Sequence, residues 1–224
     1  KHYFVSTDAG ATWTNIILNN SAGVFELGVV GNNVVCYTNG TGPIWVSTNN
    51  GLIFSNAGNP NISTTNGFLT IGSTMYSASK KGMCYTTNGG FNWTFPANDG
   101  MPSYPDGSKP STSLVYHNGK LYANSIDKII YTTNNGVNWT ASNITLANNS
   151  NSYSMVSYGG SIYAALYGLE SSSRGVLKTS DGGNNWAFMN SGLPAISIRT
   201  LFINNEFLLA GTYMGGICRI PLST

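Results

Sequence analysis

The sequence predicts an all-β fold, and two observations lead to this prediction. A short motif, Ser/Thr-Thr/Ser-Asp/Asn-x-Gly-x-x-Trp/Phe, occurs five times, and its Asp or Asn position recurs after 41, 39, 46 and 47 residues. Between the motifs, short runs of apolar and β-branched residues alternate with turn residues, and no segment has a helical period. A period of about 40 residues is typical of β-propellers built from four-stranded antiparallel blades.

The five copies of the motif keep the same order of residue types. Their Asp or Asn, Gly and aromatic positions are Asp8, Gly10 and Trp13; Asn49, Gly51 and Phe54; Asn88, Gly90 and Trp93; Asn134, Gly136 and Trp139; and Asp181, Gly183 and Trp186. An Asp or Asn side chain accepts hydrogen bonds from backbone N–H groups two residues on, and Gly supplies the positive φ of a tight reversal. The aromatic residue begins the next strand and is expected to be buried between neighbouring blades. We therefore assign the motif a structural role.

Each repeat is expected to contain a strand, a tight turn, a strand, a loop, a strand, the motif and a last strand. The paired first and second strands are expected at 26–30 and 34–38, 68–71 and 75–79, 113–116 and 121–125, 154–158 and 161–166, and 199–203 and 207–212. The third strands are expected at 3–6, 44–47, 83–86, 129–132, 176–179 and 216–220. Four blades should then be complete and two partial. We interpret residues 1–224 as a single domain that is part of a longer propeller.

The motif resembles the Asp-box, also called the bacterial neuraminidase repeat, and the resemblance covers essentially the whole chain. Families that carry this box include sialidases, two-propeller xyloglucanases, the sortilin ectodomain, photosystem II assembly factors and secreted bacterial proteins. In those families the box lies at a turn remote from the active site. The resemblance therefore implies a fold and no chemistry, and it favours a secreted or cell-surface location.

Composition argues against several classes of function. Charged residues make up 8% of the chain and the net charge is +2 without a basic run, whereas nucleic-acid binding draws on clustered Lys and Arg. No apolar run reaches the ~18 residues that a membrane span requires. The three cysteines and two histidines lack the spacing of metal ligands, so neither a metal nor a cofactor is expected.

The candidate ligand-binding residues lie in loops that a propeller presents on the face away from the motif turns. The least repeat-like loop is 96–110, which is long and contains four prolines, so it would lose little entropy on binding. A second candidate loop is 167–174. The candidate residues are Tyr104, Asp106, Lys109, Asp127, Tyr167, Glu170 and Arg174. Exposed tyrosines in such loops would suit sugar stacking and a protein partner equally well.

Catalytic interpretations have weaker support. Sialidases hold the substrate carboxylate with three arginines, but the three arginines of this chain lie in a loop, a first strand and a third strand. A two-carboxylate glycosidase would pair an acid with a base or nucleophile across a cleft. Its candidates here are Asp99 or Asp106 with Asp127 or Glu170.

We therefore expect a non-enzymatic recognition or structural module that binds a glycan or an extracellular protein through its loop face. Two alternatives stay open. One is a fragment of a glycoside hydrolase, sialidase-like or xyloglucanase-like, and the other is a protein-assembly scaffold.

Overall fold

The computed structural model describes residues 2–17, 23–38, 42–60, 62, 67–146, 151–167, 174–193, 197–204, 206–213 and 215–222. The chain divides into two compact units, unit 1 at residues 1–95 and unit 2 at residues 96–224. Every regular element in the described parts of both units is a β-strand, which confirms the expected all-β class. The same residues contain no helix that could cross a membrane.

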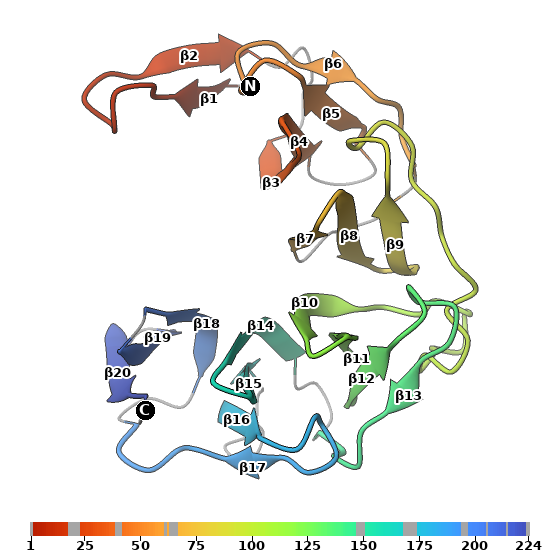
Figure 1. Ribbon diagram of the computed structural model, residues 1–224, viewed down its shortest axis with the longest axis vertical. Coiled ribbons are helices and arrows are strands. Elements are labelled where there is room, and N and C mark those ends of the chain that lie inside the picture. The colour runs from red at the N-terminus through yellow and green to blue at the C-terminus, as the bar shows by residue number, and fades with distance from the viewer. Residues whose placement is uncertain are drawn as a thin grey trace. The chain divides into compact units, whose positions relative to one another are not determined.

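Unit 1 contains three antiparallel sheets that follow one another along the chain (Figure 1). Their strands are β1 (His2–Val5) and β2 (Thr14–Ile17); β3 (Val24–Val30), β4 (Asn33–Thr38), β5 (Ile44–Ser47) and β6 (Ser55–Asn56); and β7 (Phe68–Ile71), β8 (Thr74–Ser79) and β9 (Gly82–Thr86). Buried Val35 and Ile44 of the second sheet share an apolar core with Met75 and Cys84 of the third sheet. The second and third sheets are thus joined face to face by buried apolar side chains.

Unit 2 contains three further sheets of the same kind. Their strands are β10 (Thr112–His117), β11 (Lys120–Ser125), β12 (Lys128–Thr132) and β13 (Thr140–Ala141); β14 (Asn151–Tyr158), β15 (Ser161–Tyr167), β16 (Gly175–Thr179) and β17 (Ala187–Phe188); and β18 (Ile198–Ile203), β19 (Phe207–Thr212) and β20 (Ile217–Pro221). Tyr122 and Ile162 belong to the core between the first two of these sheets, and Val176 and Leu208 to the core between the last two. The first strands β10, β14 and β18 lie next to one another.

The expected first, second and third strands are all present, with bounds within three residues of those expected. One fourth strand differs from the expectation. After the third motif the fourth strand is reduced to a single bridge between Tyr85 and Thr94. In the four-stranded sheets, the N–H three residues after the motif aromatic donates to a third-strand carbonyl at 2.7–2.9 Å; the donors are Ala57, Ser142 and Met189. The equivalent residue in the third repeat is Pro96, which has no N–H to donate. Three of the four sheets expected to be complete therefore have four strands.

Each copy of the motif closes its turn with two side-chain acceptors. The hydroxyl of the first residue accepts a hydrogen bond from the N–H of the motif glycine, at 2.7–3.1 Å. The Asp or Asn Oδ1 accepts from the backbone N–H four residues on, at 2.9 Å in all five copies. The expected span was two residues. The longer span arises because two successive residues, such as Asn135 and Gly136, have positive φ and widen the reversal.

The turns are also held by the sheet that precedes them in the same unit. Asn33 Nδ2 donates to the Gly89 carbonyl at 3.0 Å, and Tyr122 Oη donates to the Gly182 carbonyl at 2.8 Å. Tyr3 donates in the same way to the carbonyl of Gly51. Burial raises the pKa of Tyr122 to about 12, so its phenol stays a protonated donor at neutral pH. The motif therefore ties consecutive sheets together.

The expected burial of the motif aromatics holds for some of them and not for others. Trp139 is 5% exposed, and half-buried Trp93 and Trp186 pack against the cores between sheets. Phe54 is half-buried and meets the Tyr3 ring edge-on at 5.1 Å. Trp13 is 62% exposed, so the expectation of burial is wrong for this residue. The second, third and fifth turns are held by the sheet that precedes each of them in the same unit, and no sheet precedes β1 in the described residues.

The two tryptophans provide a matched test of this burial. Replacing Trp139 with alanine should cost roughly 3–5 kcal/mol of the free energy of unfolding, because the substitution leaves a cavity. Replacing exposed Trp13 should cost less than about 1 kcal/mol, since solvent fills its place. Urea unfolding of both variants measures the difference. Equal losses would contradict the packing described for Trp139.

A second prediction concerns pH. The backbone N–H of Asn185 and, second in effect, its side-chain amide donate hydrogen bonds to the Asp181 carboxylate. These bonds lower the pKa of Asp181 from 3.8 to about 2. Because the folded-state pKa lies below the unfolded value, this carboxylate contributes stability above pH 3.8 that is lost as the pH falls toward 2. Three other copies of the motif carry Asn at this position, so Asp181→Asn should keep the turn. We expect the melting temperature of the variant to fall less steeply than that of the parent between pH 5 and pH 2. Parallel curves would contradict this assignment.

Candidate functional site

All the sequence-predicted ligand residues belong to unit 2, and Glu170 lies outside the described residues. We use the name "loop end" for the end of unit 2 where second strands finish and first strands begin. It comprises residues 102–111, 125–128, 167, 174, 197–199, 212–213 and 215–216. The candidate residues fall into three groups there: the tip of the long loop, the β11–β12 turn, and the ends of β15 and β16.

The first half of the long loop packs against a motif turn. The Asn98 N–H donates to the Gly136 carbonyl at 3.0 Å, and the Trp139 N–H donates to the Asp99 carbonyl at 2.7 Å. The buried indole N–H of Trp139 donates to Asn98 Oδ1 at 3.1 Å. The expectation that this loop opens away from the motifs is therefore wrong for residues 98–101. The physical reason is that a buried indole N–H requires an acceptor, and this loop supplies it.

The second half of the loop forms a closed tip. The Tyr104 N–H donates to the Ser108 carbonyl at 2.9 Å, and the Gly107 N–H donates back to the Tyr104 carbonyl at 2.9 Å. Asp106 Oδ1 accepts from both the N–H and the hydroxyl of Ser108. Within this tip the Tyr104 side chain is 49% exposed. Asp106 thus serves the turn, whereas Tyr104 projects from it.

Lys109 ties the two ends of the loop together. Its ammonium group donates to the carbonyls of Ala97 at 3.2 Å and Asn98 at 2.9 Å. Asp127 is half-buried in the β11–β12 turn, where its carbonyl accepts from the Leu146 N–H at 2.7 Å. Asp106 and Asp127 are therefore held by two separate turns. The structure assigns Lys109 a positioning role and leaves Tyr104 as the projecting side chain of this group.

A second group gathers at the ends of β15, β18 and β19. The Arg199 guanidinium lies over the Tyr167 ring, 4.1 Å from its centroid, and 5.1 Å from the centroid of the Tyr213 ring. The two rings meet edge-on, with centroids 6.1 Å apart and an interplanar angle of 80°. Sequence reasoning named Tyr167 and Arg174 as candidates but missed Arg199 and Tyr213, which the structure places beside Tyr167. Their association depends on the register of β18 and β19.

The position of Arg199 follows from a β-bulge. Ile198 pairs with Thr212 and Thr200 pairs with Gly211, so Arg199 is the extra residue of β18. A bulge redirects the side chain of its extra residue relative to the regular pleat. The first strands β3, β10 and β14 have register shifts at the corresponding place. The bulge therefore recurs in these first strands, and the residue at the bulge differs from strand to strand.

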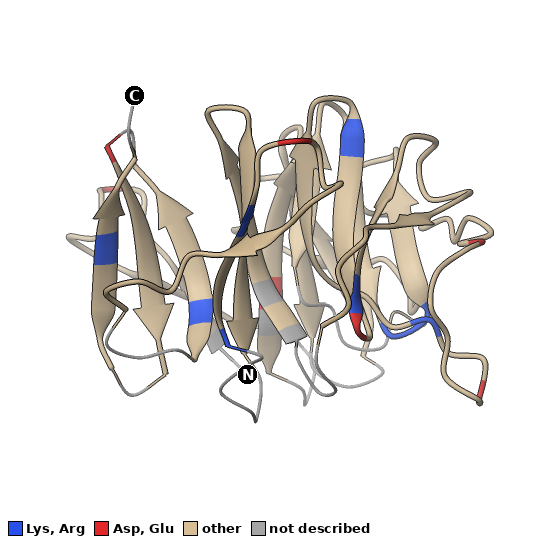
Figure 2. Ribbon diagram, turned by 90° about the horizontal axis from the view of Figure 1, so that it is seen from below, with Lys and Arg blue, Asp and Glu red and all other residues tan. Residues whose placement is uncertain are grey.

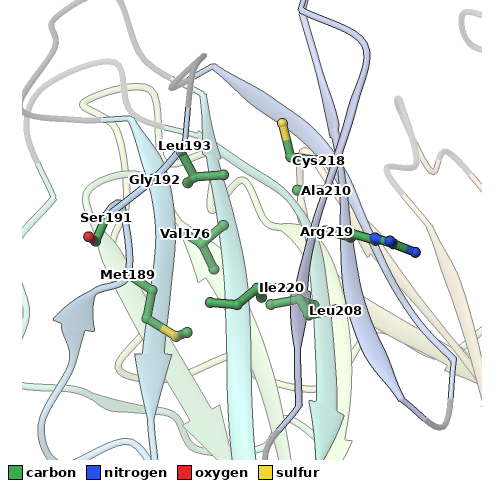
Figure 3. A pocket seen from close by; sticks show the side chains of 10 residues that line it. All are labelled: Val176, Met189, Ser191, Gly192, Leu193, Leu208, Ala210, Cys218, Arg219 and Ile220. Atoms are coloured by element: carbon green, nitrogen blue, oxygen red, sulfur yellow. The ribbon is translucent and has the colours of Figure 1, made fainter.

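A cavity of about 200 Å³ lies between the last two sheets of unit 2. Figure 3 shows apolar side chains around it, including Val176, Leu193 and Leu208, while Arg219 is directed away. Leu208, Ala210 and Cys218 take the strand positions that Ile162, Ala164 and Leu177 take in the preceding sheet. Trp186 of the motif packs against the core that contains those three residues. The cavity thus lies where a motif aromatic packs elsewhere, and we regard it as a packing feature of the fold.

Charge is sparse over the described ribbon. Figure 2 shows few blue and red segments, most of them single, separated by long uncharged stretches. Several described lysine and arginine side chains lie over aromatic rings, among them Arg199, Lys120, Lys178 and Arg219. Charged groups at the loop end are therefore few.

The role assigned to Lys109 can be tested by exchange measurements. Lys109→Met removes the ammonium group that bridges two carbonyls while keeping most of the side-chain length. We expect faster amide hydrogen exchange and faster proteolytic cleavage in 102–110, with little change elsewhere. Lys81→Met, in the exposed turn after β8, serves as the control and should leave the loop unchanged. Unaltered protection of the loop in Lys109→Met would contradict a positioning role.

No protein-family model matches this chain, and no curated protein matches it. Solved structures do share its fold. A GH74 enzyme from Niastella koreensis is 22% identical with a TM-score of 0.63, over 97% of this chain and 33% of that chain. An extracellular domain assigned to a one component system from B. thetaiotaomicron is 12% identical with a TM-score of 0.70, over 95% of this chain and 29% of that chain.

A third similar structure is YCF48 bound to D1 peptide, which is 15% identical with a TM-score of 0.69, over 99% of this chain and 73% of that chain. This chain thus spans about a third of the length of the first two proteins and about three quarters of the third. At these identities the likeness shows the fold alone. The three are β-propeller-type folds, so this chain has a propeller-like all-β fold.

Proposed function

We propose that this chain is a secreted or cell-surface recognition module, without enzymatic activity of its own, that binds a glycan or a protein through the loop end of unit 2. The proposal includes a single domain of Asp-box repeats that spans both units. The observation that carries it is Tyr104, half-exposed on a tip whose backbone is already closed by hydrogen bonds. An aromatic side chain on a rigid loop loses little conformational entropy when it binds, so more of its contact energy appears as affinity.

The sparse charge of the chain supports the same proposal. An interface built from tyrosine and a few polar groups is suited to sugar rings or to a protein surface, because the ring provides a large apolar face and its hydroxyl a hydrogen bond. Among the similar structures, one is an extracellular domain and another is bound to a peptide. Both are consistent with a binding role, which for this chain is a proposal.

The test of this function compares two tyrosines of similar exposure. Tyr104→Ala should weaken binding by about 1–3 kcal/mol on a glycan array or an array of extracellular proteins, because aromatic anchors carry much of an interface's energy. Tyr116→Ala is the control, since Tyr116 is 43% exposed on β10, outside the loop end. Circular dichroism spectra of both variants should match the parent. Equal losses from both variants would contradict a site at the loop.

A glycosidase panel on the same preparation tests the hydrolase alternative. Turnover of a sialoside or β-glucan that disappears with Asp106→Asn or Asp127→Asn would overturn the non-enzymatic proposal. Absence of both binding and turnover would leave the assembly scaffold as the surviving function.

A further inference from the structure

We propose that the outer edge of β20 binds an extended segment of a partner protein, which adds to the sheet as a fourth strand and fills the cavity beside Leu208 with a tryptophan. An acidic residue follows directly after this tryptophan. The site goes beyond the loop-end function, because the tip around Tyr104 takes no part in it. It lies within unit 2 and is continuous with the apolar core between the last two sheets, since Leu208 and Ala210 belong to that core and also line the cavity.

The first step is the exposed edge of the last sheet. In the described residues β20 pairs with β19 alone, whereas β5, β12 and β16 each also pair with a short fourth strand. Ile220 of β20 is 39% exposed, and Thr179, at the corresponding place in β16, is 2% exposed. An exposed strand edge presents backbone donors and acceptors on which another chain can pair. This edge is therefore open to strand addition.

The turn that leads into the fourth strand elsewhere has no counterpart after β20. Ile220 takes the place of Thr179, whose hydroxyl accepts the N–H of the motif glycine at 3.1 Å. Leu222 takes the place of Asp181, whose Oδ1 accepts the N–H four residues on at 2.9 Å. Neither replacement has a side-chain oxygen. The Leu222 N–H instead donates to the Glu206 carbonyl at 2.8 Å, so the last described residues continue the pairing with the second strand and leave the outer edge uncovered.

The second step is the cavity beside this edge. It measures about 200 Å³, and apolar side chains such as Leu193 and Leu208 line it (Figure 3). Apolar cavities of about 150 Å³ in proteins stay dry and bind benzene, so this one can hold an aromatic ring. Between the preceding two sheets, the Trp186 ring packs against the corresponding core. The chain's own repeats thus indicate tryptophan as the side chain that fits.

The third step is the register of the added strand. The Met189 N–H, three residues after Trp186, donates to the Val176 carbonyl at 2.7 Å. Ile217 takes the place of Val176 in β20, so its carbonyl faces the outer edge. A peptide N–H three residues after the tryptophan can therefore donate to it. Pro221, four residues on at the same edge, has no N–H, so pairing ends before it. The added strand is then as short as β6, β13 and β17.

The charge at this edge favours an acidic residue in the partner. Arg219 takes the place of Lys178, which pairs with Ala187, the residue directly after Trp186. Side chains at directly opposed positions of antiparallel strands lie on the same face, and opposite charges there attract. The Arg219 side chain is exposed and directed away from the cavity, so it leaves room for the tryptophan (Figure 3). A glutamate or aspartate directly after the tryptophan would lie opposite Arg219.

The experiment measures the fluorescence anisotropy of a fluorescein-labelled peptide as the full chain is added. The peptide has the sequence of residues 184–190, Asn-Asn-Trp-Ala-Phe-Met-Asn, with Ala187→Glu. Trp186→Ala in the peptide should weaken binding about tenfold or more, because the tryptophan is the anchor. Methylation of the peptide nitrogen at Met189 should weaken binding roughly tenfold, because it removes a main-chain donor. The peptide with Ala187 should bind about two- to fivefold more weakly than the glutamate peptide at low salt.

A native thiol reports whether the cavity is filled. Cys218 lines the cavity and is half-buried, whereas Cys36 and Cys84 are 1% and 0% exposed. Saturating peptide should slow alkylation of Cys218 by iodoacetamide, measured by mass spectrometry of the intact chain. The two buried thiols are internal references and should stay unmodified throughout. The Trp186→Ala peptide at the same concentration should give no protection.

Protein variants locate the site. Ala210→Leu places additional atoms in the cavity and should weaken peptide binding about tenfold or more. Phe202→Ala is the matched control, since Phe202 is 63% exposed on the opposite face of the same sheet and pairs with Leu209. It should bind within about twofold of the parent. Arg219→Glu, at an exposed position, should reverse the charge preference, so that a peptide with Ala187→Lys binds more tightly than the glutamate peptide. Melting temperatures show whether each variant is folded.

The outcomes are distinct. Equal binding of the tryptophan and alanine peptides, or unchanged alkylation of Cys218, would overturn the inference. Equal binding of the N-methylated peptide would overturn strand addition. Dimerisation of the chain in sedimentation, lost in Ala210→Leu, would overturn the inference in favour of a second copy as the occupant. Tyr104→Ala should leave peptide binding unchanged, so failure of the loop-end function and failure of this site are separate results.

Discussion

The rest of the structure depends on the pair of side-chain hydrogen bonds inside each motif turn. One hydroxyl and one Asp or Asn oxygen satisfy the N–H groups that a reversal between third and fourth strands would otherwise leave without partners, and the 2.9 Å Asp or Asn bond is the same in all five copies. Such a turn needs no help from distant residues. It sets where the third strand ends, and it places the aromatic residue at the start of the fourth strand.

The same turn then organises packing between sheets. Because its glycine carbonyls face outward, a Tyr or Asn of the preceding sheet can donate to them, as Tyr122 does to Gly182. Trp93 and Trp186 follow the turn into the apolar core between two sheets. The pattern also accounts for the exceptions. Trp13 is exposed because, in the described residues, no sheet precedes its turn to cover it. The cavity beside Leu208 lies between two sheets at a place where no motif aromatic fills the space.

In the proposed function, binding falls to residues that the repeat does not use. The tip around Tyr104 and the cluster around Arg199 both lie at the loop end of unit 2. Both are made rigid by local contacts, the tip by backbone hydrogen bonds and the arginine by two aromatic rings. Specificity can then arise from a few groups on a neutral surface.

The sequence by itself determined the all-β class, the strand positions and the turn sites, because these follow from local chemistry repeated five times. It could not show that Pro96 removes a ladder bond, since that depends on which N–H faces the third strand. It also placed Tyr104 and Tyr167 in loops without indicating their neighbours. The association of Tyr167, Arg199 and Tyr213 joins residues far apart in sequence through strand register and a bulge. A one-residue change in register would turn each side chain to the opposite face of its sheet, so only the tertiary structure decided this association.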